Sequence, residues 1–123
     1  FVLDPISRIV AGVQARVPGL PVIVFARGIG SHQIKAAALP GVNAIGVETE
    51  LGLDEIDVNV ALQGNLDPVA LLAGEDVARR EALMVCAKIP KERHIFNLGH
   101  GIRLGTDPAV VGAVVDAVRR SEA

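Results

Sequence analysis

His100 is the residue best suited to chemistry in this sequence of 123 residues. It stands between Gly99 and Gly101, directly after an apolar run, so the backbone can turn tightly while the imidazole faces the end of a strand. An imidazole in that place could bind a substrate or handle a proton near neutral pH. A histidine packed and hydrogen-bonded in the interior would have the same sequence context, so spacing alone leaves both interpretations open.

Other polar side chains follow apolar runs elsewhere in the chain. Arg27 and Arg103 could each hold a carboxylate through a bidentate guanidinium contact, or form an ordinary surface ion pair. Gln63 and Asn65 alternate with apolar neighbours, which predicts that they share one face of a strand. Asp67 precedes a proline, and this pair is typical of a helix N-terminus, so we expect Asp67 to be a cap.

The sequence gives little support for a phosphate-binding loop or for a metal site. The run Gly28-Ile29-Gly30 could start a phosphate-binding loop, but Gln33 stands where a third glycine would be needed, which favours a flexible loop. The other two histidines, His32 and His94, are expected to be exposed or at a sheet edge. Dispersed histidines and a single helical cysteine predict no metal site.

The elements that must position these residues alternate along the chain. Apolar runs predict strands at 21–27, 43–48, 58–64 and 94–100. Helical spacing and expected caps such as Asp4 and Ser31 predict helices at 4–17, 31–38, 69–73, 75–88 and from 106 onward, with at most two turns at 50–57. Successive strand–helix units indicate a parallel sheet, whose carboxyl edge is where ligands bind.

Composition narrows the class of protein. Hydrophobic residues make up 50% of the chain but aromatic ones only 2%, which suits aliphatic parallel strands covered by helices. Four units fit either a flavodoxin-type sheet or half of a (β/α)8 barrel, which needs about 250 residues. The 12 basic and 14 acidic residues show no basic excess, so no nucleic-acid partner is expected.

The same composition bears on location. No apolar run approaches the ~18 residues of a membrane span, so no membrane association is expected. One cysteine fits a reducing compartment, and a cytoplasmic location is predicted. The first residues contain neither a methionine nor a basic segment, so the chain is expected to be part of a longer protein, without a signal peptide.

Two long motifs resemble a known family. The segments VALQGNLDP (60–68) and HIFNLGHGI (94–102), followed by Thr-Asp-Pro and a valine-rich helix, resemble the end of uroporphyrinogen decarboxylase. PVIVFARG (21–28) and GVNAIGV (41–47) match the two preceding strands in order. The resemblance implies an α/β fold in which residues 1–123 form the C-terminal half of a (β/α)8 TIM barrel, four parallel strands alternating with helices.

The resemblance also implies an activity. These enzymes are homodimers without cofactor or metal, and they remove CO2 from the four acetate side chains of uroporphyrinogen to give coproporphyrinogen. A protonated pyrrole can accept the electrons of the breaking bond, so the site needs an acid, a carboxylate and basic residues. His100 matches the family histidine and is expected to bind substrate or handle a proton. The expected substrate-binding residues, which would line or brace the site, are Arg27, Gln63, Asn65 and Asn97.

Two departures leave alternatives open. Glu48-Thr49-Glu50 stands where the family usually has Asp-Trp-Thr, and the family's main arginines and essential aspartate have no counterpart here. The isolated chain is therefore expected to be inactive. A cobalamin-dependent methyltransferase of the same barrel type would place a zinc-binding cysteine where His100 stands. A half-barrel that binds a partner without chemistry is the third interpretation.

Overall fold

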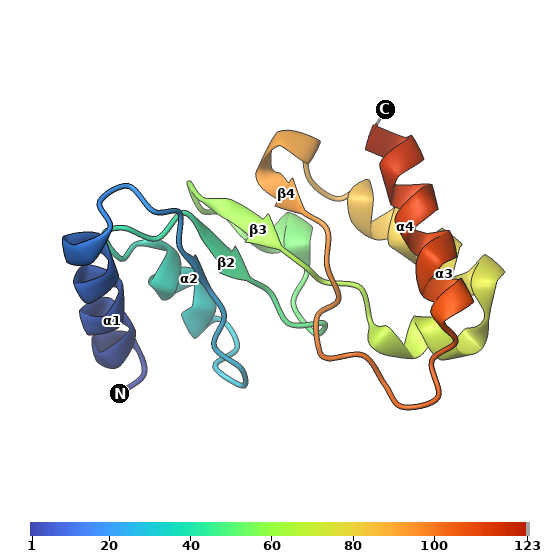
Figure 1. Ribbon diagram of the computed structural model, residues 1–123, viewed down its shortest axis with the longest axis horizontal. Coiled ribbons are helices and arrows are strands. Elements are labelled where there is room, and N and C mark those ends of the chain that lie inside the picture. Colours follow the sequence, from blue (N-terminus) through green and yellow to red (C-terminus); the bar gives the residue numbers. More distant parts are fainter. Residues whose placement is uncertain (123) are drawn as a thin grey trace.

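The computed structural model describes residues 1–122, which form one four-stranded parallel sheet with helices between the strands (Figure 1). The strands are β1 (Ile23–Val24), β2 (Ala44–Gly46), β3 (Ala61–Gln63) and β4 (His94–Ile95). The α-helices are α1 (Leu3–Arg16), α2 (His32–Ala37), α3 (Glu75–Cys86) and α4 (Pro108–Glu122). Three short 3₁₀ helices are η1 (Leu53–Glu55), η2 (Pro68–Ala73) and η3 (Lys91–Arg93).

The strand order decides between the two predicted architectures. The strands pair in the order β1-β2-β3-β4, each parallel to the next. A doubly wound sheet of the flavodoxin type reverses direction and places later strands on both sides of the first. In an unreversed sheet, crossovers of one hand carry all helices to the same face. The fold is therefore the strand–helix arrangement of half a (β/α)8 barrel, as predicted.

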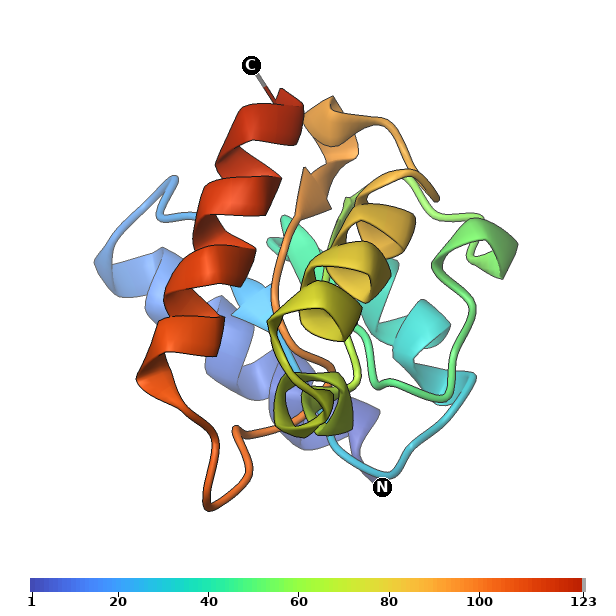
Figure 2. The ribbon, with the colours of Figure 1, turned by 90° about the vertical axis from the view of Figure 1, so that its right-hand side faces the viewer.

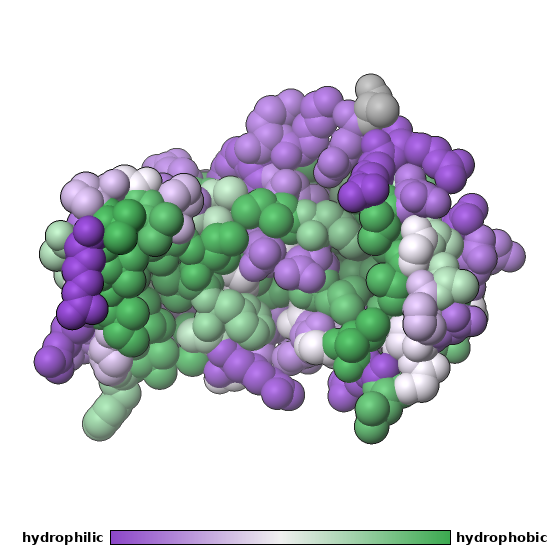
Figure 3. All heavy atoms as spheres, in the orientation of Figure 1, coloured by the Kyte–Doolittle hydropathy of each residue, from purple (hydrophilic) through white to green (hydrophobic). Residues whose placement is uncertain are grey.

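The two faces of the sheet differ in exposure. Val24, Ile45 and Leu62 stand in one row of the sheet register and are 9%, 1% and 2% exposed. Ile23 and Phe25, the residues before and after Val24, are 45% and 49% exposed. Figure 3 shows hydrophobic side chains gathered over α1 and the neighbouring strands. One face thus packs beneath the helices, and the other keeps apolar side chains in contact with solvent.

The helices on the covered face pack through small residues. Ala78 and Ala82 of α3 are completely buried, and α3 lies side by side with α4 (Figure 2). Val114 of α4 belongs to the same buried cluster as these alanines. No helix within residues 1–122 combines the length and apolar character needed to cross a membrane.

The regular strands are shorter than predicted. The run 58–64 forms a strand only at Ala61–Gln63, which begins three residues later than predicted. It ends before Gly64, whose φ of 137° a regular strand does not allow. Pairing resumes as a single parallel bridge between Leu66 and Leu98. The segment 50–57, for which at most two helical turns were predicted, contains the single turn η1.

The helix ends were predicted with mixed success. Asp67 is confirmed as a cap, because its Oδ1 accepts a hydrogen bond from the Val69 amide at 2.9 Å. Ser31 precedes α2 but makes no side-chain cap. The first helix begins at Leu3, so Asp4 lies inside the first turn, where its charge favours the helix dipole, and not before it.

Candidate functional site

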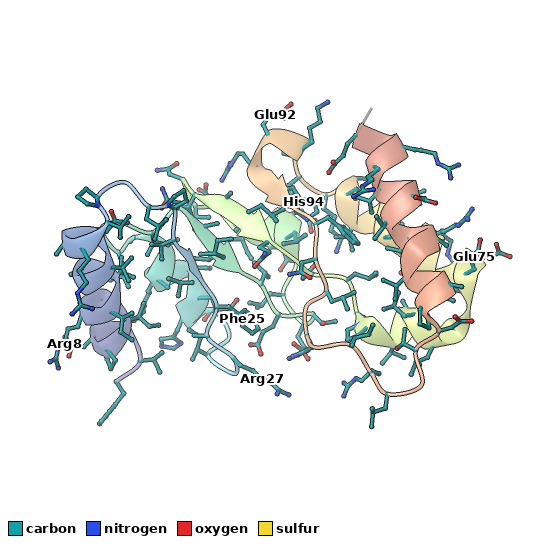
Figure 4. All side chains as sticks on the ribbon, viewed as in Figure 1. Arg8, Phe25, Arg27, Glu75, Glu92 and His94 are labelled. Atoms are coloured by element: carbon teal, nitrogen blue, oxygen red, sulfur yellow. The ribbon has the colours of Figure 1, made fainter. Side chains whose placement is uncertain are left out.

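A cavity of about 460 Å³ opens at the carboxyl edge of the sheet. Four of the predicted site residues line it: Arg27 follows β1, Gln63 is the last residue of β3, and Asn97 and His100 follow β4. A neighbouring hollow of about 590 Å³ shares Arg27 and His100 with the cavity and is also lined by Arg103. Figure 4 shows Arg27 on the loop at the end of β1, below Phe25. The parallel topology thus brings residues far apart in the sequence to one place.

Asn65 does not line this cavity. Its side chain is 5% exposed, and its Nδ2 donates hydrogen bonds to the main-chain carbonyls of Glu48 and Leu51. The Glu48 carbonyl accepts at a distance of 2.9 Å. Asn65 therefore fastens the segment after β2 from within the protein.

The other two histidines lie outside the cavity. His32 is exposed on α2, as predicted. His94 begins β4 and is half-buried, with its Nε2 hydrogen-bonded to the Gly64 carbonyl. Of the two expected places for His94, exposed or at a sheet edge, the structure shows the second. The alternating sequence pattern could not reveal the bond across to Gly64.

His100 lies beside two carboxylates. Its Nε2 is 3.8 Å from Oε1 of Glu50, and potential ligand atoms of Glu48, Glu50 and His100 lie within 4.8 Å of one another. Within the described part of the chain, this is the one such group of three. Glu50 is 74% exposed, and exposed carboxylates commonly stand together without a metal, so the cluster alone does not define a metal centre.

A close contact between two backbone segments places His100 there. A Cβ atom built on Gly99 would overlap the side chain and the backbone nitrogen of Thr49. Only glycine therefore lets the segment after β4 pack against residues 48–50. The chain bends at Gly99, but neither Gly99 nor Gly101 has a positive φ, so the glycine is needed for the contact with Thr49, which the sequence did not reveal.

The loop that carries Arg27 is bound on both sides. The Gly28 amide donates to Oε1 of Glu48 at 2.9 Å, so an amide of the Gly-Ile-Gly run binds a carboxylate of the chain itself. Nε2 of Gln33 donates to the Ala26 carbonyl at 3.0 Å. Glu48 and Gln33 are 7% and 2% exposed. Sequence reasoning noted both residues only as departures from a motif.

Cys86 lies at the opposite end of the sheet from His100. It borders a hollow with His94, at the amino end of β4, and with Ser121 of α4. Burial raises the pKa of the Cys86 thiol above its ordinary value, while a hydrogen bond with Ser121 acts against this. A neutral thiol on a helix does not supply the strand-end cysteine that the methyltransferase interpretation requires.

Comparison with known proteins agrees with the motifs. The family model described as "Uroporphyrinogen decarboxylase (URO-D)" matches residues 1–121. Proteins named uroporphyrinogen decarboxylase from Granulibacter bethesdensis and Paracoccus denitrificans are 39% and 34% identical, each over 97% of this chain and 36% of its own length. That of Alkalilimnicola ehrlichii is 39% identical over 98% of the chain and 34% of its own length. The chain thus spans about a third of the length of these relatives, and it belongs to the uroporphyrinogen decarboxylase family.

Proposed function

We propose that the protein containing this chain decarboxylates uroporphyrinogen, removing its four acetate carboxyl groups to give coproporphyrinogen. The observation that carries this proposal is the meeting of Arg27, Gln63, Asn97 and His100 around one cavity at the carboxyl edge of the sheet. Family membership supplies the substrate class. In barrels of this kind, reactions take place at that edge.

Each residue has a role that its surroundings support. His100 binds substrate or passes a proton at a pyrrole carbon, since it lines both hollows and its side chain is 18% exposed. Arg27 holds a carboxylate of the substrate through its guanidinium. Gln63 and Asn97 offer amide groups to the ligand from β3 and from the segment after β4. Asn65 supports the site from the protein interior through its hydrogen bond to the main-chain carbonyl of Glu48.

The proposed chemistry requires more of the barrel than residues 1–123. We propose that these residues form its C-terminal half, since the segments 60–68 and 94–102 resemble the end of the family's sequence. Within residues 1–122, β1 and β4 each pair with one strand, which leaves two edges for the rest of a barrel. The aspartate that stabilises the protonated pyrrole and the main arginines come from the rest of the protein. We therefore propose that the chain alone is inactive and that the complete enzyme is a homodimer, without cofactor or metal, in the cytoplasm.

A chimaera tests the proposal. This chain would replace the matching segment of the Granulibacter bethesdensis protein, and coproporphyrinogen formation would be followed by chromatography after oxidation of the products. We expect turnover by the chimaera and none by the chain alone. His100→Ala should lower kcat/KM about 100-fold if the imidazole transfers a proton. Lys88→Ala, on an exposed position after α3, is the control and should leave it unchanged.

The outcomes separate the parts of the proposal. A folded chimaera that does not turn over uroporphyrinogen would argue against this activity. Turnover by the chain alone would contradict only its inactivity in isolation. Unchanged kinetics in the His100→Ala chimaera would remove His100 from the site.

A further inference from the structure

All three buried polar or charged side chains of the described residues lie near the same sheet edge. They are Gln33, Glu48 and Asn65, which are 2%, 7% and 5% exposed. Each binds main-chain groups in or beside the segments that follow β1 and β2. Burying a polar side chain has a free-energy cost unless its hydrogen bonds are satisfied. Because all three lie near one edge of the sheet, we expect them to have a function at that edge.

Two of these side chains grip the backbone on either side of Arg27. Gln33, from α2, binds the carbonyl of residue 26, and Glu48, at the end of β2, binds the amide of residue 28. The loop takes φ angles of 75° at Gly28 and 50° at Gly30, which glycine adopts without steric cost. The two bonds thus restrict the backbone from which the Arg27 side chain extends.

Arg27 itself is available for a ligand. Its side chain borders both hollows at the carboxyl edge, and no carboxylate within residues 1–122 forms an ion pair with it. Asn65 in turn holds Glu48 in place, since it donates a hydrogen bond to the main-chain carbonyl of Glu48. A guanidinium that is held before the ligand arrives loses less conformational freedom on binding.

We infer that Gln33 and Glu48 are positioning residues that hold the Arg27 loop so that its guanidinium faces the cavity and binds a carboxylate group. The identity of that carboxylate rests on the proposed function. The positioning of the loop by Gln33 and Glu48 is independent of it. Glu48 acts here as a hydrogen-bond acceptor. Its negative charge beside the cavity opposes an anionic ligand.

This distinction gives the test its design. Glu48→Gln and Glu48→Leu both remove the negative charge, but only glutamine keeps an oxygen that can accept from the Gly28 amide. Gln33→Leu removes the bond to the Ala26 carbonyl. Gln14→Leu is the matched control, because Gln14 fastens a different turn by bonding to Gly19 and Leu20.

Two measurements would be made on the 123-residue chain. Heteronuclear NOE values for residues 26–30 report the order of the loop without any ligand. Titration with uroporphyrin I, an octacarboxylate, reports anion binding. We expect Glu48→Leu and Gln33→Leu to lower the loop NOE values and to weaken uroporphyrin I binding about five- to tenfold. Glu48→Gln should keep the loop ordered and bind at least as tightly as the wild type, and Gln14→Leu should change neither.

The inference would be overturned if the loop stayed as ordered in Glu48→Leu and Gln33→Leu as in the wild type. It would also be overturned if Glu48→Gln weakened binding as much as Glu48→Leu, because Glu48 would then act through its charge. A loop that loosens as expected while uroporphyrin I binds neither wild type nor variants would support the positioning of the Arg27 loop and overturn carboxylate binding by Arg27 in this chain. The proposed activity of the complete protein is tested separately by the chimaera.

Discussion

Nε2 of His100 lies 3.8 Å from Oε1 of Glu50, although β3, α3, β4 and three short 3₁₀ helices separate the two residues in the sequence. The contact follows from the residue before the histidine. Gly99 packs against Thr49 so closely that a Cβ atom would overlap it. The position of the imidazole therefore depends on a backbone contact and on the absence of a side chain.

Replacement of Gly99 by alanine should displace the segment that carries His100. The added methyl group meets the backbone of Thr49, which cannot move aside as a flexible side chain could, so we expect a loss of about 1–3 kcal/mol in the free energy of unfolding. Urea denaturation measures the loss, and the His100 ring signals should shift in NMR spectra. Gly101→Ala is the control, because a Cβ atom there meets nothing within 4 Å. Equal stability of the two variants would contradict the contact.

Asn65 should contribute to stability through its buried hydrogen bonds. Asn65→Leu removes a donor that satisfies the carbonyls of Glu48 and Leu51, so two carbonyls would lose a hydrogen bond. We expect a loss of about 1–3 kcal/mol in the free energy of unfolding by urea denaturation. Asn59→Leu, at an exposed position, should cost little. A similar small effect at both positions would show that Asn65 does not brace the site.

The order of the strands and helices and most residues of the cavity could be predicted from the sequence. Parallel strands that alternate with helices must end at one edge, so His100, Arg27, Gln63 and Asn97 could be placed together from their positions after apolar runs. Strand lengths could not be predicted in this way, because the φ of Gly64 interrupts β3. Glu48 and Gln33 were missed as support residues, since their partners lie in another loop and only the folded geometry joins them.

Cys86 should react with alkylating agents only at higher pH than an unfolded thiol. Burial raises its folded pKa, so the neutral form is favoured in the native state. Its contribution to stability is complete below the unfolded pKa and is lost as pH rises through the raised folded pKa. Iodoacetamide rates measured against pH should therefore have a midpoint above that of the chain in urea. Coincident midpoints would contradict the raised pKa, and Cys86→Ala is the control for labelling at other residues.

A polar substitution on the exposed face of the sheet should reduce self-association of the chain alone but lower the stability of the chimaera. Ile23 is 45% exposed on the helix-free face, next to an unpaired strand edge. In the chain alone, Ile23→Ser should reduce self-association in sedimentation experiments, because exposed apolar patches and open edges promote contact between copies. In the chimaera the same position would be covered by the rest of the barrel, and we expect a loss of about 2–4 kcal/mol in stability. Met84→Ser, exposed on α3, is the control for removing apolar surface elsewhere. A substitution at Ile23 that left the chimaera as stable as before would argue against a closed barrel, because no strand would then cover this face.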